Sequence, residues 1–410
     1  MNTQIDANPK LSETEVGSAI RRLTLVNFRN YRYLRLNLNK PFIVLYGENG
    51  SGKTNILEAI SFLSQGRGLR NAKLSEIRTF DFLAEKQSSP VFINNKGWAA
   101  SAQVRHFDEE FSLGTSVETQ LRETSYNDAK EVERRIAQIN DQKLSSQNEF
   151  CNYLTLIWIT PQMDRLFLGG AQHRRLFLDR IVSAFDTDHA RRLSTFDNLY
   201  HQWQQILKTG KFNHQWLLSL EEQMAGVGVA IAAARREQVF KLNHFMEKNP
   251  DDTFPEAVLQ LDGTIETMLD KKPAVFVEDY YRESLLKLRA SVLGDNTTED
   301  ISKTDLKVIY KKKNVPANLC STGEQKSLLL STILSESRCL AAQRSFPPIL
   351  LLDEVAAHLD DTKRHLLLKK LDDLHTQVWL TTTNPFEFSL LQDRAQFFEV
   401  KDNSVSPKSI

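Results

Sequence analysis

The feature that most constrains this chain is a glycine-rich stretch between a strand-like and a helix-like segment. It reads Gly47-Glu48-Asn49-Gly50-Ser51-Gly52-Lys53-Thr54. The apolar run 42–46 precedes it, and residues 55–63, with apolar side chains at helical spacing, follow it. Strand, glycine-rich turn and helix are the context in which G-x-x-x-x-G-K-[ST] forms a phosphate-binding loop. We therefore predict an α/β fold with a nucleotide site at this turn.

The predicted phosphate loop gives its residues distinct tasks. Its backbone N–H groups would hold phosphate oxygens, helped by the partial positive charge of the helix N-terminus. Lys53 would reach the β- and γ-phosphates, and the Thr54 hydroxyl would ligate Mg²⁺. The alternative is a chance match, which average residue usage gives in roughly one chain in a hundred of this length. We expect ATP and Mg²⁺ as cofactors.

A pair of acids after a second apolar run complements this loop. Asp353 and Glu354 follow residues 349–352, which are all Ile or Leu. Asp353 would hold Mg²⁺ opposite Thr54, and Glu354 would polarise a water for attack on the γ-phosphate. Four apolar residues before two acids are a weak signal alone, but a strong one beside a phosphate loop. Lys53 and Glu354 are therefore the predicted catalytic residues.

Length and composition limit the class of protein. A chain of 410 residues exceeds the size of a single core, so two domains are expected. The 52 basic and 52 acidic residues exclude a uniformly basic surface but leave room for a local basic patch. The three cysteines lack metal or disulfide spacing. No apolar run approaches the roughly 18 residues that span a bilayer, so we expect a cytoplasmic protein with no membrane partner.

The chain is predicted to divide into four parts. Residues 1–19 are polar and are expected to be a flexible tail. Residues 20–180 would form the first part of an ATPase head, with an antiparallel β lobe. Residues 181–304 would be an inserted helical arm domain, and residues 305–410 the second part of the head.

Shorter patterns predict the elements within these parts. Alternation predicts β-lobe strands at 98–104, 111–117 and 135–139, with a hairpin tip at 140–141. The arm would contain two long helices, at about 180–209 and 216–248. After it, a strand is expected at 306–310, a helix at 321–340 and a final edge strand at 397–400. Strands that alternate with helices imply a mainly parallel sheet.

The stretch Ser321-Thr322-Gly323-Glu324-Gln325 opens the helix at 321–340 and could be only an N-cap. It also resembles the signature sequence of ABC-type ATPases. In that class, this loop caps the γ-phosphate held by a partner subunit, so the resemblance implies ATP contacts from Ser321, Gly323 and Glu324. Gln162 stands at the Q-loop place, which implies a metal contact. Residues 357–360 match the D-loop, and residues 381–383 match the switch region.

A finer resemblance is to the RecF family of bacterial DNA-repair ATPases, which covers roughly residues 20–401. It rests on spaced stretches of the sequence: 25–31, 47–60, 66–70, 161–162, 169–179, 321–326 and 352–360. It implies a weak, DNA-stimulated ATPase whose ATP-driven homodimer binds double-stranded and gapped DNA until slow hydrolysis releases it. The implied partners are RecR and RecO, with which it would promote RecA loading on single-stranded gaps. Arg29 would approach the nucleotide phosphates.

Basic residues near the phosphate loop are the preferred DNA contacts. Arg67, Arg70 and Lys73 follow the phosphate-loop helix on the side that faces DNA in the family, although a solvated charged face is the alternative. No basic run interleaved with aromatic residues suggests base stacking, so backbone contact is expected. Two other functions stay open: the energising subunit of a transporter, and an ATP sensor that barely turns over.

Overall fold

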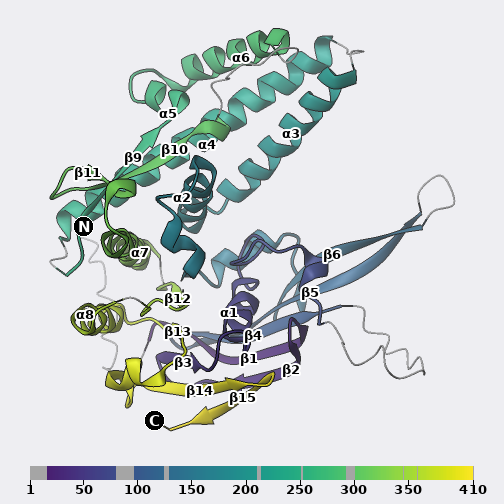
Figure 1. The fold of residues 1–410 in the computed structure, drawn as a ribbon. Coiled ribbons are helices and arrows are strands. Elements are labelled where there is room, and N and C mark those ends of the chain that lie inside the picture. The colour runs from purple at the N-terminus through teal and green to yellow at the C-terminus, as the bar shows by residue number, and fades with distance from the viewer. Residues whose placement is uncertain are drawn as a thin grey trace, which may run out of the picture. The chain divides into compact units, whose positions relative to one another are not determined.

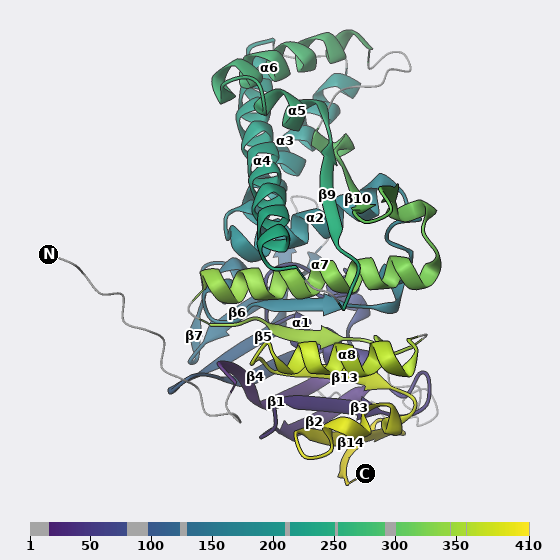
Figure 2. The same ribbon diagram turned by 90° about the vertical axis from the view of Figure 1, so that its left-hand side faces the viewer.

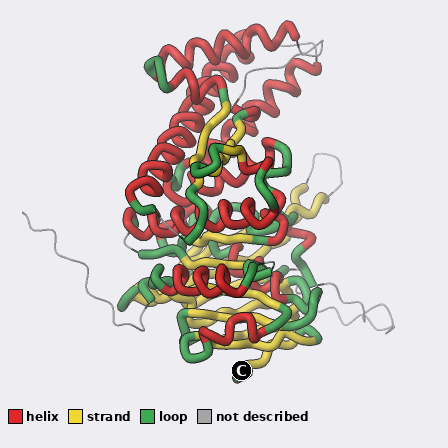
Figure 3. The backbone as a smooth tube through the Cα atoms, turned by 60° about the vertical axis from the view of Figure 1, so that its left-hand side comes forward, coloured by secondary structure: helices red, strands yellow, loops and turns green. Residues whose placement is uncertain are grey.

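A computed structural model gives the fold of the chain (Figure 1) and describes residues 16–79, 97–123, 129–209, 214–250, 253–291, 301–344, 346–357 and 359–409. The chain divides into two compact units. The first consists of residues up to Pro161 and from Ala341 onward, and the second runs from Gln162 to Leu340. Strands gather in the first unit, and helices dominate the second (Figure 3).

A six-stranded sheet forms the centre of the first unit. Its strand order is β15-β14-β3-β13-β12-β8. The strands are β3 (Phe42–Tyr46), β8 (Leu156–Ile159), β12 (Ile349–Leu352), β13 (Val378–Thr382), β14 (Ala395–Lys401) and β15 (Ser404–Lys408). All neighbours are parallel except β14 and β15. The mainly parallel sheet is thus confirmed, and the carboxyl ends of β3, β13 and β12 meet at one edge.

The predicted antiparallel β lobe is also present. Its strand order is β2-β1-β4-β5-β6-β7, and every pairing is antiparallel. The strands are β1 (Ser18–Phe28), β2 (Tyr31–Asn37), β4 (Ala99–His106), β5 (Glu109–Glu123), β6 (Ala129–Ile139) and β7 (Gln142–Lys143). Asn140 and Asp141 have φ values of 46° and 65°, which suit a two-residue hairpin turn. The predicted hairpin tip is confirmed.

Helix α1 (Lys53–Ser61) lies between the two sheets of the first unit. Its buried residues share one core with the inner faces of both sheets, for example Ile56 with Leu25 of β1 and Leu351 of β12. Figure 2 shows α8 (Asp361–Asp372) beside β13. The helix that follows the phosphate loop is therefore fixed by packing on two sides.

Three long helices form the core of the second unit. The helices of this unit are α2 (Ala171–Phe185), α3 (His189–Thr209), α4 (His214–Lys248), α5 (Thr264–Leu269), α6 (Ala274–Ser291) and α7 (Thr322–Gln343). Trp203 of α3, Met224 of α4 and Tyr281 of α6 lie in its core. A small antiparallel sheet in the order β11-β10-β9 comprises β9 (Ala257–Asp262), β10 (Asp305–Tyr310) and β11 (Val315–Pro316).

Several sequence predictions need correction. The helix expected over residues 180–209 is two helices, because Asp186 accepts a hydrogen bond from the backbone N–H of Asp188 and turns the chain. The strand expected at 306–310 joins the small antiparallel sheet. The strand at 397–400 is not an edge, because Asp402 and Asn403, both at positive φ, turn the chain back into β15.

The predicted flexible tail, 1–19, is too long. Ser18 and Ala19 are buried residues of β1, while residues 1–15 lie outside the described part of the chain. The limits of the two compact units, at Pro161 and Ala341, also differ from those of the predicted domains, 20–180, 181–304 and 305–410. The second unit takes in residues 162–180, which include the start of α2, as well as β10 and α7 as far as Leu340.

Helix α4 is apolar enough to cross a membrane by length and composition, which the sequence analysis overlooked. Among the described residues it is the one such helix, with a mean hydropathy of 1.3 over 18 residues. Half of that window is buried inside the protein. Leu217, Met224 and Ile231 on this helix pack in the core of the second unit. This packing is that of a core helix.

Candidate functional site

The phosphate loop joins the end of β3 to the start of α1. Its three glycines, Gly47, Gly50 and Gly52, have φ values of 154°, 81° and 110°. These left-handed values favour glycine over residues that carry a side chain. A Cβ on Gly47 would lie 2.2 Å from the carbonyl oxygen of Val400. The loop conformation therefore depends on its sequence, as the motif predicts.

The Lys53 side chain folds back over this loop. Its Nζ atom donates hydrogen bonds of 2.8 Å to the backbone oxygens of both Gly47 and Glu48. Burial lowers the pKa of Lys53, and the carboxylates of Glu354 and Asp353 partly oppose this shift. The ammonium group is thus held within the loop that would cradle the phosphates.

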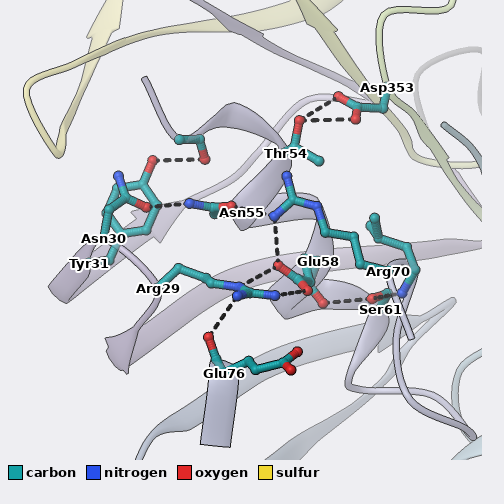
Figure 4. A network of polar contacts seen from close by, with 12 residues as sticks. Arg29, Asn30, Tyr31, Thr54, Asn55, Glu58, Ser61, Arg70, Glu76 and Asp353 are labelled. Atoms are coloured by element: carbon teal, nitrogen blue, oxygen red, sulfur yellow. Dashed lines mark hydrogen bonds and ion pairs between the residues drawn. The ribbon is translucent and has the colours of Figure 1, made fainter. Parts of the chain in front are cut away.

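Asp353 lies at the carboxyl end of β12, directly beside the start of α1. The Thr54 Oγ1 atom is 3.1 and 3.0 Å from its two carboxylate oxygens (Figure 4). The strand order β3-β13-β12 brings Thr381 of β13 into the same cluster, and its hydroxyl lies 2.7 Å from Asp353 Oδ1. The predicted pairing of Thr54 with Asp353 is therefore present in the structure.

Glu354 follows Asp353 with an unusual backbone. Its φ is 50°, in the left-handed region that non-glycine residues rarely adopt. Its N–H donates a 2.8 Å hydrogen bond to the Thr381 hydroxyl, which also contacts Asp353. One threonine therefore fixes both acids. Strained backbone of this kind concentrates at functional sites, where the surrounding contacts hold it.

These groups suit the expected cofactors. Mg²⁺ is usually held by one or two protein oxygens together with phosphates and water, rather than by a complete protein cage. Thr54 and Asp353 supply such a pair of oxygens at the end of the phosphate loop. Within the described residues, no three His, Cys, Asp or Glu side chains gather as a metal cage. This donor set fits a magnesium–triphosphate site.

The turn between β1 and β2 supports the phosphate loop. Tyr31 donates a 3.1 Å hydrogen bond to the Gly52 oxygen, and burial raises its pKa to about 12. The Asn30 amide donates to the Ser51 oxygen at 3.4 Å and accepts from Asn55 Nδ2 at 2.7 Å. Sequence reasoning noted this turn but assigned no role to Asn30 or Tyr31. Their contacts span more than 20 residues of sequence, so spacing alone could not reveal them.

Arg29, from the same turn, lies in an ion-pair network around Glu58 (Figure 4). Its guanidinium donates two bonds, of 2.8 and 2.6 Å, to the two oxygens of Glu58. Arg70 reaches Glu58 at 3.1 Å and Asn55 at 2.8 Å. Glu58 is fully buried on α1. The predicted nucleotide contact of Arg29 stays a prediction, and Glu58 is a residue that sequence reasoning missed.

The signature loop lies in the second unit, and contacts among residues close in sequence hold its conformation. Glu324 accepts hydrogen bonds from the N–H and hydroxyl of Ser321, at 2.9 and 3.0 Å. Lys313, in the turn after β10, pairs with Glu324 at 2.5 Å. Lys313 and Ser321 together lower the pKa of Glu324 to about 2. Ser321, Gly323 and Glu324 thus lie at the start of α7, where the Ser321 hydroxyl accepts a 3.4 Å hydrogen bond from the Glu324 N–H. The N-cap, which the sequence analysis gave as the alternative to a signature loop, is therefore present, and the ATP contacts of these residues stay a prediction.

Other predicted residues are placed without a test of their roles. Gln162 lies exposed in a short 3₁₀ helix, Pro161–Arg165, in the second unit. In the D-loop match, His358 lies outside the described residues. Of the preferred DNA contacts, Arg67 and Lys73 lie on the same loop as Arg70. These assignments stay predictions.

Fold and site together define a P-loop ATPase head of the ABC and SMC type, with an antiparallel β lobe and an inserted helical domain. The family model described as RecF/RecN/SMC N terminal domain matches residues 19–405. The chain is 39% identical to a DNA replication and repair protein RecF from Allorhizobium ampelinum and 38% identical to one from Agrobacterium fabrum. The matches cover 94% and 95% of this chain and 98% of each relative. The chain belongs to the RecF family.

Solved structures agree on the fold. The structure of the recombination mediator protein RecF-ATPrS in the RecFOR pathway is similar with a TM-score of 0.77 and 21% identity, over 97% of this chain and 100% of that one. The corresponding RecF-ATP structure gives 0.73 and 22%, over 96% and 100%.

Proposed function

We propose that this protein is an ATP-dependent DNA-binding protein of recombinational repair and replication, with a weak, DNA-stimulated ATPase activity. One observation carries the proposal. Thr54 and Asp353 are 299 positions apart in sequence, yet their side chains lie 3.0 Å apart beside the phosphate loop. A threonine hydroxyl and an aspartate carboxylate in this place are the protein ligands that a nucleotide-bound Mg²⁺ uses.

The residues of the first unit supply the chemistry of hydrolysis. The bound triphosphate would supply the electrophilic phosphorus, and Mg²⁺ would neutralise part of the phosphate charge. Lys53 holds the phosphate charge, and the loop N–H groups orient it. Glu354 orients and deprotonates the attacking water. The hydrogen bond from the Glu354 N–H to the Thr381 hydroxyl holds Glu354 in place for this task.

The exposed signature loop supports a dimer as the active form. Ser321 and Gly323 are exposed and Glu324 is half-buried at the N-terminus of α7. Two copies of the chain would each offer this loop to the triphosphate held by the other, so that two ATP molecules are enclosed. The helix N-terminus favours the γ-phosphate electrostatically. Hydrolysis removes that phosphate, and the dimer then separates.

The ligand of this ATP-bound dimer is double-stranded or gapped DNA, whose backbone meets the loop that carries Arg67, Arg70 and Lys73. Family membership supports this choice, since the relatives are named DNA replication and repair proteins. RecR and RecO are the expected partners, because similar solved structures belong to the RecFOR pathway. With them the protein would promote RecA loading on single-stranded gaps, in the cytoplasm.

A Glu354→Gln variant tests this function, because it keeps the shape of the site and removes the base. We expect gel filtration to show a dimer with Mg-ATP and a monomer with ADP. Fluorescence anisotropy with gapped DNA should show binding about tenfold tighter with ATP than with ADP, weakening steeply with salt. A monomer at saturating Mg-ATP, with no DNA binding at low salt in either state, would favour an ATPase of another class, such as a transporter subunit.

A further inference from the structure

Glu58 is a buried carboxylate that the chemistry of hydrolysis does not use. It lies on α1, one turn after Thr54, and its side chain is 0% exposed. A charge buried to this extent is tolerated only where cations and hydrogen bonds compensate for the lost water. Its partners therefore reveal what the residue does.

Two arginines share this single carboxylate. Arg29 Nε and Arg70 Nη1 both donate to the same oxygen, Glu58 Oε2, at 2.8 and 3.1 Å. Arg29 holds the other oxygen as well. Their side chains are 21% and 35% exposed, so both can reach a ligand at the surface. Glu58 thus has one more cation than its charge requires.

The two arginines come from different segments that both border the phosphate loop. Arg29 has a φ of 54° between β1 and β2, and its guanidinium also donates to the Glu76 oxygen at 2.7 Å. Arg70 stands in the loop after α1 and donates to Asn55, which contacts Asn30. Arg29 therefore lies in the turn whose Asn30 contacts the phosphate loop, and Arg70 lies in the loop that the proposed function assigns to DNA.

We propose that Glu58 is a positioning residue that lets only one of these arginines leave at a time. If Arg29 turns to a nucleotide phosphate, Arg70 must stay, and if Arg70 turns to a DNA phosphate, Arg29 must stay. Loss of both would leave a buried charge unpaired, which is strongly destabilising. Nucleotide and DNA are then coupled through Glu58, and the coupling is reciprocal. This inference rests on the proposed function, since it needs both ligands.

The coupling appears as a change in what Arg70 contributes to DNA binding. We compare the dissociation constants of the Arg70→Gln variant and the parent for gapped DNA by anisotropy, without nucleotide and with a slowly hydrolysed ATP analogue and Mg²⁺. In the parent, the loss should be about tenfold without nucleotide, as for one charge-assisted contact. With the analogue it should fall to less than about threefold, because Arg29 has left Glu58.

A Glu58→Gln background should remove the nucleotide effect. A neutral amide can be left by both arginines, so the Arg70→Gln loss should be about tenfold in both states. In an Arg29→Gln background, Glu58 keeps Arg70 permanently, so Arg70 cannot reach DNA. The Arg70→Gln substitution should then weaken DNA binding only slightly, with or without nucleotide. This second background keeps the test decisive if Glu58→Gln does not fold. Asn55→Ala is the matched control, since Asn55 also contacts Arg70 but carries no charge, and it should keep the nucleotide effect.

Each failure has a distinct meaning. The role of Glu58 is overturned if nucleotide does not change the loss of DNA affinity that Arg70→Gln causes in the parent. It is also overturned if nucleotide changes this loss equally in the Glu58→Gln background. Parent protein that binds no DNA in either state overturns the proposed function itself, and the inference with it.

Discussion

The phosphate loop of the first unit and the signature loop of the second unit reach their conformations in different ways. The phosphate loop relies on distant segments, since Thr54 meets Asp353 from 299 positions away and Asn30 meets Ser51 from 21. The signature loop relies on its neighbourhood, since Ser321 meets Glu324 three positions away and Lys313 meets it from eleven. One site needs the fold to exist, whereas the other is largely a local helix cap.

This difference has a functional consequence. The phosphate loop carries its own cation, its two acids and a threonine that fixes them, so it offers a nearly complete nucleotide site within one chain. The signature loop offers a hydroxyl and a helix N-terminus whose acid, Glu324, is neutralised by Lys313. Such a loop can add to a site but cannot form one. The comparison predicts that the two loops act on ATP at different stages.

The largest expected effect separates these stages. Lys53→Met should weaken ATP binding by the monomer by about 100-fold, because a charge-assisted contact to the phosphates is lost. Ser321→Ala should change that affinity by less than about twofold, yet abolish the ATP-dependent dimer. Isothermal titration with ATP and gel filtration measure the two quantities.

Loss of the helix cap is the control for Ser321→Ala. It should cost only about 1 kcal/mol of stability, visible in thermal unfolding. If Ser321→Ala weakened ATP binding by the monomer as much as Lys53→Met does, the signature loop would contact ATP of its own chain, and the comparison would fail.

A smaller effect tests how strongly the phosphate loop depends on the distant fold. In Gly47→Ala, the new methyl group would meet the Val400 oxygen at 2.2 Å on a left-handed backbone, so β14 must shift. In Gly50→Ala, the backbone is also left-handed, but no atom lies within 4 Å. We expect losses of unfolding free energy of about 3 and about 1 kcal/mol, measured by urea unfolding. Equal losses would show that β14 does not constrain the loop.

The local character of a feature decides whether the sequence reveals it. The phosphate loop, the strands on either side of it and the acids after β12 all carry their signals within a few residues, so sequence predicts them. The hairpin turn at Asn140 and Asp141 is likewise predicted from its own two residues. The pairing of Thr54 with Asp353 needs one further step, namely that both follow strands of one parallel sheet.

Features that depend on tertiary packing escape the sequence. Glu58 reads as an ordinary polar residue of a helix, because nothing nearby shows that two arginines converge on it. The strand β10 has the same apolar pattern whether it joins the central sheet or pairs with β9. The break between α2 and α3 rests on one Asp186 turn inside a continuous helical pattern. In each case a contact, rather than a spacing, decides the structure.

The smallest effect concerns α7, the helix that carries the signature loop. Glu336 on this helix is buried, which raises its pKa to about 7, and Arg180 of α2, 3.8 Å away, only partly opposes the shift. Burial raises the pKa of the Cys339 thiol, and the nearby Glu336 carboxylate raises it further. Within the nucleotide site of the first unit, by contrast, Asp353 is hydrogen-bonded to two hydroxyls.

The raised pKa of Glu336 sets the sign of a pH dependence. Between its ordinary value of 4.5 and about 7, the folded protein keeps a proton that the unfolded chain releases. Stability is therefore greatest below pH 4.5 as far as this group is concerned, and falls as pH rises toward 7, by at most about 1.4 kcal/mol per pH unit. Glu336→Gln should flatten the pH dependence of the urea unfolding midpoint between pH 5 and 7.5. If the variant kept the slope of the parent, Glu336 would titrate as an ordinary carboxylate, and its burial on α7 would not set the pH dependence.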